Sequence, residues 1–226
     1  MKFKSLRGMD DLFSIDLVKW QTLETEFKSV FLKFNAGEVR NPMLESTDLF
    51  TRSVGSSSDI VNKELYTFND RNDESISLRP EGTAGFVRSL IESNKDNETG
   101  KYWYPGPMFR YERPQKGRLR QFHQVGVEYV GFEEGHAEFE IMSLVIALIA
   151  SVKIKHYNIQ INHLGNSKVK QKFTKALVEY LQQFEGELSD LELRRLGTNP
   201  LRILDSKDPK TLKILEKSPS YTDYLE

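Results

Sequence analysis

The sequence predicts an α+β fold in which an antiparallel sheet is flanked by helices. The two arms of the stretch 106–131 alternate in residue character like paired strands, and a basic loop joins them. Apolar residues recur at three- and four-residue steps between Asp16 and Phe34, as in an amphipathic helix. A second pair of short strands, 64–68 and 75–79, surrounds the turn sequence NDRND. At 226 residues the chain is long enough to bury a substantial core.

Composition excludes several classes of site. The net charge is -1, so a contact with nucleic acid has to come from a local basic patch rather than from an overall field. The chain has no cysteine, which rules out disulfides and thiolate metal sites, and its four histidines do not have the spacing of metal ligands. We therefore expect no structural metal. The start of the chain does not read as a signal peptide, and we expect a cytoplasmic protein with no membrane segment.

The first element that we expect is the helix from Asp16 to Phe34, ending near Gly37. A strand over 38–40 then runs into Pro42, which has no N–H to donate to a sheet and so marks an edge or an interface. By itself this pattern is typical of any helix-to-strand packing unit.

Pro80 ends the strand 75–79, and Glu81, Gly82 and Thr83 open the next helix. Its predicted inner face consists of Phe86, Val87, Leu90 and Ile91. Glu81 could act simply as an acid that complements the helix dipole.

Further along, the apolar pattern predicts a buried helix over 141–152, too short for the ~20 residues of a membrane span. A half-buried strand over 156–162 and an amphipathic helix over 168–184 follow.

The stretch 106–131 carries most of the chemistry. If its arms are strands, Met108, Arg110 and Glu112 share one face of the first arm. On the second arm one face is polar and the other is a plain core face: Phe122, Gln124, Gly126 and Glu128 against His123, Val125, Val127 and Tyr129. Such a polar face is costly to bury unless a polar ligand covers it. The loop between the arms suits phosphates, although it could also be the solvated tip of an ordinary hairpin: Arg113, Lys116, Arg118 and Arg120.

The segment FRYERPQKGRLRQFHQ resembles motif 2 of the class II aminoacyl-tRNA synthetases, and its wording is similar to that of the histidyl-tRNA synthetase family. The start RGMxD, the segment LRPEGT and the late stretch RRLGTNPLRILDSK also resemble segments of that family. The resemblance implies a class II synthetase-like sheet, with motif 1, the dimer-forming element, at about 16–45 and motif 2 at about 101–131. It makes 188–226 a connector and implies a homodimer.

Residue by residue, the resemblance divides the site into three groups. Arg110 would be the catalytic residue, bridging the substrate carboxylate and the α-phosphate of ATP. The amino acid would be held by Glu81, Gly82, Thr83, Gln124 and Glu128, of which Glu128 would accept a hydrogen bond from the imidazole. ATP would be bound by Arg110, Glu112, Arg118 and Phe122, and the acceptor end of tRNA(His) by Arg113 and Gln115. Mg²⁺ would accompany ATP, and no protein ligands for it can be identified.

The implied reaction is ATP-dependent activation of histidine to histidyl-adenylate, followed by transfer to tRNA(His). The chain contains neither a Walker loop nor a dinucleotide-binding fingerprint. Class II synthetases need neither, because the carboxylate of the substrate attacks the α-phosphate in line. The protein then supplies position and positive charge rather than a nucleophile.

Several family segments have no counterpart in residues 1–226: the histidine-specific RGLDYY and GGGRYDG segments, motif 3 and an anticodon-binding domain. The resemblance therefore covers a partial catalytic domain, incomplete at the C-terminal end, and we expect it to be inactive alone. One alternative is the non-catalytic, synthetase-like regulatory subunit of ATP phosphoribosyltransferase. Such a subunit need not keep the motif 2 residues, whereas this sequence retains them: Arg110, Glu112, Arg118, Phe122 and Gln124. A remnant that serves only dimerisation also stays open.

Overall fold

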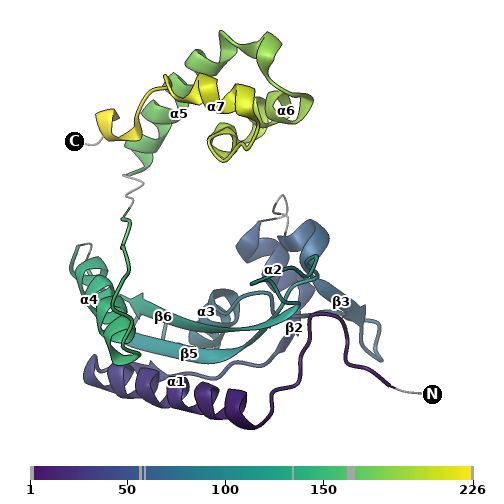
Figure 1. Cartoon of the computed structure of the whole chain (residues 1–226), viewed down its shortest axis with the longest axis vertical. Helices are drawn as coiled ribbons and strands as arrows, with labels where there is room; N and C mark the ends of the chain where they lie inside the picture. Colours follow the sequence, from purple (N-terminus) through teal and green to yellow (C-terminus); the bar gives the residue numbers. More distant parts are fainter. Residues whose placement is uncertain (1–2, 56–57, 59, 134, 162–165, 225–226) are drawn as a thin grey trace. The chain divides into compact units, whose positions relative to one another are not determined.

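A computed structural model describes residues 3–55, 58, 60–133, 135–161 and 166–224 (Figure 1). The chain forms two compact units, Met1–Tyr157 and Asn158–Glu226. The first unit holds all the strands of the described residues, and the second is helical.

The main sheet of the first unit has the strand order β1-β5-β6. The short strand β1 (Gly37–Glu38) runs parallel to β5 (Gly100–Phe109), which pairs antiparallel with β6 (Gln121–Val130) along its whole length. This pairing confirms the predicted pair of strands around a basic loop. Residues directly opposite each other, such as Met108 and Phe122, share a face.

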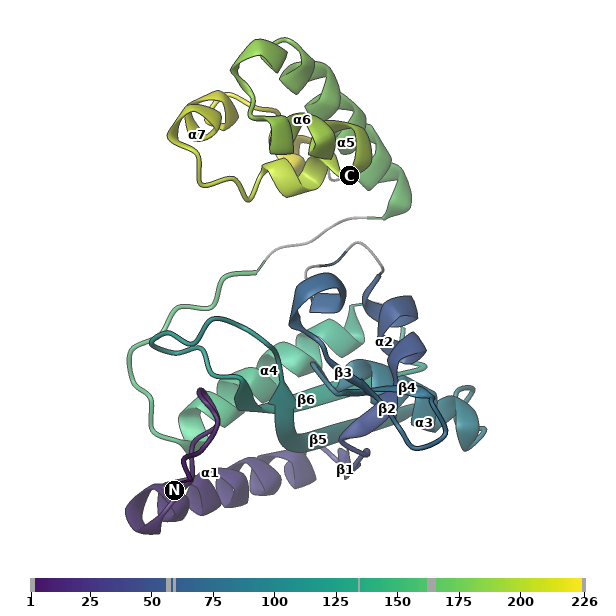
Figure 2. The ribbon, with the colours of Figure 1, turned by 90° about the vertical axis from the view of Figure 1, so that its right-hand side faces the viewer.

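Helix α1 (Ser14–Lys33) and helix α4 (His136–Ser151) pack on one face of this sheet (Figures 1 and 2). Their shared core contains Phe31, Trp103 and Leu144. The rings of Phe31 and Trp103 are stacked, with centroids 4.5 Å apart. The helix predicted from Asp16 to Phe34 is thereby confirmed to within two residues.

Helix α3 (Thr83–Glu92) covers the opposite face of the sheet. Phe86 and Leu90 pack there against Tyr104 and Met108 of β5. The prediction was wrong for Val87 and Ile91, which are 44% and 58% exposed. The buried stripe instead includes Ala84 and Gly85, because Gly85 lies close to Asn41 and Glu45 and so turns the helix toward the preceding segment.

A second sheet has the strand order β2-β4-β3, all antiparallel. It consists of β2 (Leu44–Ser46), β3 (Tyr66–Asn69) and β4 (Ser75–Leu78), and helix α2 (Thr47–Val54) and the π-helical turn η1 (Ile60–Glu64) lie between β2 and β3. The predicted hairpin over 64–79 is confirmed. Ser77 is fully buried, and its hydroxyl lies 2.9 Å from the hydroxyls of both Thr47 and Thr67.

Two predictions for the segment after β6 were wrong. The helix expected to be buried begins at His136, and Leu144 is its only buried residue, while Ile146 is 45% exposed. No strand forms over 156–161, where Ile161 is 71% exposed; residue 162, the end of the predicted strand, lies outside the described residues. An alternating pattern forms a strand only where a neighbouring strand takes up its backbone hydrogen bonds, and among the described residues no strand pairs with this segment.

The second unit is built on helix α5 (Ser167–Gln182), which confirms the helix predicted over 168–184. Its core joins Phe173, Leu177 and Leu181 to Ile203 and Ile214. The other elements are η2 (Glu185–Glu187), α6 (Asp190–Thr198), η3 (Pro200–Ile203), α7 (Pro209–Leu215) and η4 (Tyr221–Tyr224). Within the segment 188–226, expected to serve as a connector, the described residues 188–224 pack on α5. None of the described helices in either unit combines the length and the apolar character that a membrane crossing requires.

Glu192 of α6 is a buried carboxylate within this unit, 3% exposed. Its Oε2 accepts hydrogen bonds from the backbone N–H and the hydroxyl of Ser189, at 2.9 and 2.8 Å, and its Oε1 accepts one from the Ser206 hydroxyl at 2.5 Å. Burial raises the pKa of Glu192, but the hydrogen bonds from Ser206 and Ser189 outweigh it and hold the pKa at about 2. The carboxylate is therefore ionised and has both oxygens occupied.

Candidate active site

The α3 face of β5 and β6 carries the polar residues. The register sets Tyr102 opposite Glu128, Tyr104 opposite Gly126 and Gly106 opposite Gln124. The polar face predicted for the second arm is therefore a real face of the sheet, and it lies next to the start of α3.

Glu81 sits just before α3. Its carboxylate accepts hydrogen bonds from the backbone N–H groups of Thr83 and Ala84, at 2.6 and 2.9 Å. These are two of the N–H groups that a helix leaves unsatisfied at its first turn, so Glu81 caps α3. The simple structural role considered for Glu81 is present, and the cap also fixes this carboxylate at the edge of the polar face.

Thr83, Tyr104 and Glu128 meet in one hydrogen-bonded cluster. The Thr83 hydroxyl donates to Glu128 Oε1 at 2.8 Å and the Tyr104 hydroxyl to the same oxygen at 3.0 Å, and the two hydroxyl oxygens are 3.2 Å apart. Burial raises the pKa of Tyr104 to about 12, the nearby Glu128 and Glu81 carboxylates add to the shift, and the Thr83 hydrogen bond opposes it. The phenol is therefore neutral and able to donate at physiological pH.

Arg110 lies at the other end of the same face. It was predicted within the first strand, but β5 ends at Phe109, and Arg110 is the first residue beyond it. Its Nε donates to the Pro80 carbonyl at 2.9 Å, and its guanidinium lies 5.1 Å from the centre of the Phe122 ring. Within the described residues its other N–H groups have no hydrogen bond. They are well suited to phosphate or carboxylate oxygens.

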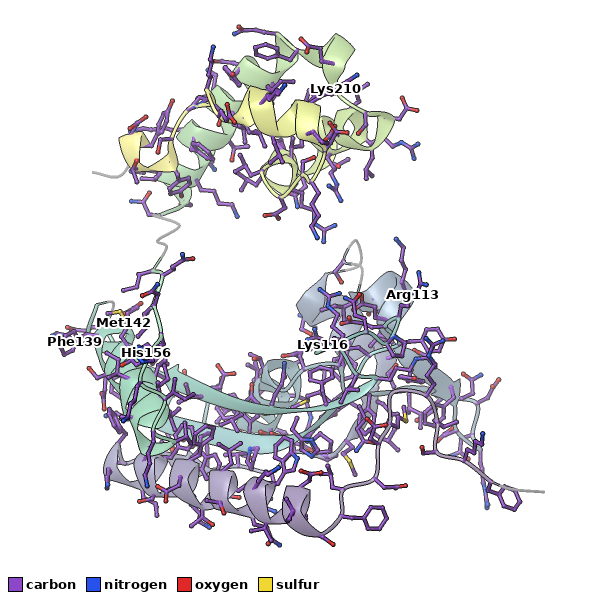
Figure 3. All side chains as sticks on the ribbon, in the orientation of Figure 1. Arg113, Lys116, Phe139, Met142, His156 and Lys210 are labelled. Carbon is purple, nitrogen blue, oxygen red and sulfur yellow. The ribbon has the colours of Figure 1, made fainter. Side chains whose placement is uncertain are left out.

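The basic loop between β5 and β6 divides into bound and free cations. Arg118 donates to the Glu112 carboxylate at 3.1 Å. Arg120 donates to the Glu112 carbonyl at 3.2 Å and stacks over the Tyr111 ring at 4.0 Å. Arg113 and Lys116 are exposed, and in the part of the chain that the structure describes neither has a partner (Figure 3).

The start of the chain holds the base of this loop. The Gly8 carbonyl accepts hydrogen bonds from the backbone N–H groups of Arg120 and Gln121, at 2.8 and 3.0 Å. Gly8 has φ +78°, and a Cβ there would lie 3.0 Å from the Arg120 nitrogen. A glycine is needed here for both reasons. The RGMxD segment, which sequence reasoning treated only as a signature, thus sets where the loop returns to β6.

Each predicted site residue has a place in this arrangement. Glu81, Gly82, Thr83, Gln124 and Glu128 gather around the start of α3 and the facing part of β6. Arg110 and Phe122 lie together at the other end, and Glu112, Arg113, Gln115 and Arg118 lie in the loop. The residue that sequence reasoning missed is Tyr104, whose alternation with Met108 on β5 was the only signal available.

A family model described as Histidyl-tRNA synthetase matches residues 8–213. The chain belongs to the histidyl-tRNA synthetase family. It is 47% identical to the Histidine--tRNA ligases of Francisella tularensis subsp. mediasiatica and Francisella philomiragia subsp. philomiragia. These matches cover 100% of this chain and 54% of each relative. The chain thus spans about half the length of the relatives it matches.

Solved structures agree with this assignment. Apo histidyl-tRNA synthetase from S. aureus matches with a TM-score of 0.78 and 35% identity over 100% of this chain and 51% of the other. The predicted α+β, class II synthetase-like fold is confirmed. An ATP phosphoribosyltransferase regulatory subunit/histidyl-tRNA synthetase from Bacillus halodurans matches at TM-score 0.63 and 20% identity over 99% of this chain and 67% of the other. That likeness concerns the fold alone, so the regulatory-subunit alternative is less supported.

The arrangement has two chemical ends. Hydroxyl and carboxylate acceptors cluster around Glu128, and a guanidinium over an aromatic ring lies at Phe122. The first end suits a ligand with N–H donors, and the second suits an anion beside a flat ring. Among the described residues, no three His, Cys, Asp or Glu side chains gather as they would around a metal ion.

Proposed function

We propose that this chain supplies the histidine- and ATP-binding part of a histidine--tRNA ligase, which activates histidine to histidyl-adenylate and transfers it to tRNA(His). The observation that carries the proposal is the pairing of an acceptor cluster at Glu128 with a cation at Phe122 on one sheet face. Gln124 lies between them on β6. From Phe122 to Glu128 the strand runs about 20 Å, enough for an amino acid joined to a nucleotide.

The cation end fits the first chemical step. A carboxylate oxygen of histidine forms a bond to the α-phosphorus of ATP as the bond to the pyrophosphate oxygen breaks. Arg110 would hold the reacting carboxylate and phosphate together and stabilise their negative charge, and Phe122 would stack on the adenine. Glu112 would approach the adenine and Arg118 the outer phosphates. ATP would bring Mg²⁺, which neutralises phosphate charge.

The acceptor end fits the amino acid. Glu81, Gly82, Thr83 and Gln124 would surround its amino group, and Glu128 would accept the imidazole N–H. In the part of the chain that the structure describes, neither Glu81 nor Glu128 has an ion pair and the Gln124 amide has no hydrogen bond, so a cationic ligand would meet two carboxylates that no cation neutralises. This end of the site would therefore prefer a substrate that has two N–H donor groups, as histidine has in its amino group and its imidazole.

The tRNA would meet the free part of the loop. We propose that Arg113 and Gln115 contact its acceptor end, since Arg113 is exposed and held by no carboxylate of the described residues. Phosphate contacts of this kind add affinity without reading sequence. Residues 188–226 would connect this catalytic part, with its motif 1 at about 16–45 and motif 2 at about 101–131, to what the relatives carry beyond it.

A homodimer formed through the motif 1 segment completes the proposal. Between α1 and the outer face of the sheet lies a cavity of about 550 Å³, lined in part by Trp20, Phe27, Trp103 and Val125. A second copy that covers this apolar lining would remove it from water. The cytoplasm is the proposed compartment, as for an enzyme that acts on tRNA.

Calorimetry with histidine, histidinol and leucine tests the acceptor end directly. Histidine and histidinol share the imidazole and the amino group, so both should give heat where leucine gives none. The ligand-binding measurement is made on this chain and on the same chain continued by the C-terminal half of the F. tularensis relative. Equal heats for histidine and leucine would contradict the proposal.

A further inference from the structure

Tyr104 is the residue around which the acceptor end is built. Tyr104 is 5% exposed, and its ring lies against two glycines of different elements, Gly82 before α3 and Gly126 of β6. A Cβ added at either glycine would come within 2.1 Å of a ring carbon of Tyr104. The ring therefore occupies the space that two side chains would otherwise fill, and this fixes where its hydroxyl lies.

The protons of the cluster can be counted. The Tyr104 and Thr83 hydroxyls have one proton each, and both are donated to Glu128 Oε1. The 3.2 Å contact between the two hydroxyl oxygens thus has no proton of its own. Glu128 Oε2 has no hydrogen bond within the described residues. The two donors hold one carboxylate oxygen and leave the other open to a ligand.

Three charged groups lie near the Tyr104 phenol: the carboxylates of Glu128 and Glu81, and the buried guanidinium of Arg79. The carboxylates of both Glu81 and Glu128 act on the Tyr104 phenol, and no cation among the described residues pairs with either of them. A neutral phenol is then the donor that can approach Glu128 without repulsion. It orients the carboxylate and leaves the negative charge in place for an N–H donor of the ligand.

We propose that Tyr104 is a positioning residue that holds Glu128 for the imidazole of histidine, an inference that rests on the function proposed above. Tyr104 acts through Glu128 and does not itself contact the substrate. Its hydroxyl determines which Glu128 oxygen accepts hydrogen bonds within the protein. The other oxygen is then available to accept a hydrogen bond from the ligand. Histidine recognition therefore depends on a hydroxyl of β5 as well as on the residues of the LRPEGT segment and β6.

The variant Tyr104→Phe tests this with the ring in place, because only the hydroxyl is removed. In the chain continued by the C-terminal half of the F. tularensis relative, the KM for histidine in pyrophosphate exchange should rise about 10-fold or more, the scale of one hydrogen bond to a charged group. The KM for ATP and the kcat should stay within about threefold, since Arg110 and Phe122 are untouched. A merely structural role would lower stability and change all three.

Tyr102→Phe is the matched control. Tyr102 lies two residues away on the same face of β5, directly opposite Glu128, and its ring packs on Phe86 at 5.3 Å, much as that of Tyr104 does at 6.3 Å. Its hydroxyl has no hydrogen bond to the described residues. Removing that hydroxyl should leave the KM for histidine unchanged.

A double-variant cycle tests the route through Glu128. If Tyr104 works only by holding that carboxylate, Tyr104→Phe should add less than about threefold to the effect of Glu128→Gln, because both changes weaken the same contact, that of the Glu128 carboxylate with the imidazole. Multiplying effects, or a Tyr104→Phe protein that matches Tyr102→Phe, would overturn the inference alone. A parent that binds histidine neither as this chain nor in continued form would overturn the proposed function and the inference with it.

Discussion

Two carboxylates of this chain are held by hydroxyl groups and differ in one respect. Glu192 in the second unit has both oxygens occupied, by Ser189 on one side and Ser206 on the other. Glu128 in the first unit has two donors on Oε1 and, within the described residues, none on Oε2. A fully satisfied carboxylate contributes to stability, whereas one that is fixed but half satisfied is ready for a ligand. The difference fits a structural role for Glu192 and the ligand-binding role proposed for Glu128.

The largest expected effect is on the stability of the second unit. Glu192→Ala removes three hydrogen bonds to a buried charge and should cost on the order of 3 kcal/mol. Far-UV circular dichroism during urea unfolding measures the loss of its helices. Trp20 and Trp103, the two tryptophans of the chain, lie in the first unit, so their fluorescence should keep its parent midpoint. Glu187→Ala, an exposed acid of η2, is the control, and an equal loss there would remove Glu192 from this role.

Low pH should reduce the stability of the second unit through the same residue, Glu192. The pKa of Glu192 is about 2 in the folded chain against an ordinary value of 4.5. Because the folded pKa is the lower one, this stabilisation is complete above about pH 5 and is lost as the pH falls from 4.5 through 2. The loss is also on the order of 3 kcal/mol, and Glu192→Gln should abolish it. An unchanged pH dependence in Glu192→Gln would show that other acids cause the acid unfolding.

Arg110→Ala is expected to change the reaction rate and not the stability. In the chain continued by the C-terminal half of the F. tularensis relative, it should slow adenylate formation by about 100-fold, the scale of losing one donor to a charged transition state. Stability should change little, because only its Nε has a hydrogen bond in the described residues. Arg113→Ala, at an exposed loop cation, should leave pyrophosphate exchange at the parent rate. A rate within about threefold of the parent for Arg110→Ala would remove this residue from the mechanism.

The smallest effect on stability is expected at Glu128. Glu128→Gln keeps the shape of the side chain and an oxygen that can accept from Thr83 and Tyr104, so urea unfolding of the first unit should change by about 1 kcal/mol or less. Histidine affinity should fall all the same, because the charge facing the imidazole is gone. A loss of stability as large as that from Glu192→Ala would erase the distinction between the two acids.

Sequence reasoning reached the parts of this structure that depend on local periodicity. The faces of β5 and β6 follow from a period of two, and the confirmed helices follow from steps of three and four residues. No strand forms over 156–161, the described part of the strand expected over 156–162, because the alternation of a segment does not encode a partner strand. Val87 and Ile91 were misplaced because the close approach of Gly85 to Asn41, a residue far away in the sequence, rotates α3.

The same reason explains what was missed in the site. In the sequence, Tyr104 looks like any aromatic residue of a strand. Only the structure shows that Gly82 and Gly126 lie against its ring. The buried state of Glu192 depends on Ser206, which lies outside its capping box. The resemblance to the family identified Glu128 and Arg110 from their positions in a motif. The hydroxyl groups that orient a carboxylate, in contrast, come from whichever segments the fold places beside it. Such partners are visible only in three dimensions.

We propose that these 226 residues contain the side chains that bind histidine and orient the reacting groups, and that the rest of the reaction needs the half that the relatives carry beyond them. Charging of tRNA(His) with histidine, with and without that half in cis or in trans, tests it most directly. We expect no measurable charging by this chain alone, because the residues that line the two halves of the active site act as a unit. We expect histidine-dependent charging once the second half is present. Robust turnover by the 226 residues alone would contradict it, as would charging with leucine by the completed protein.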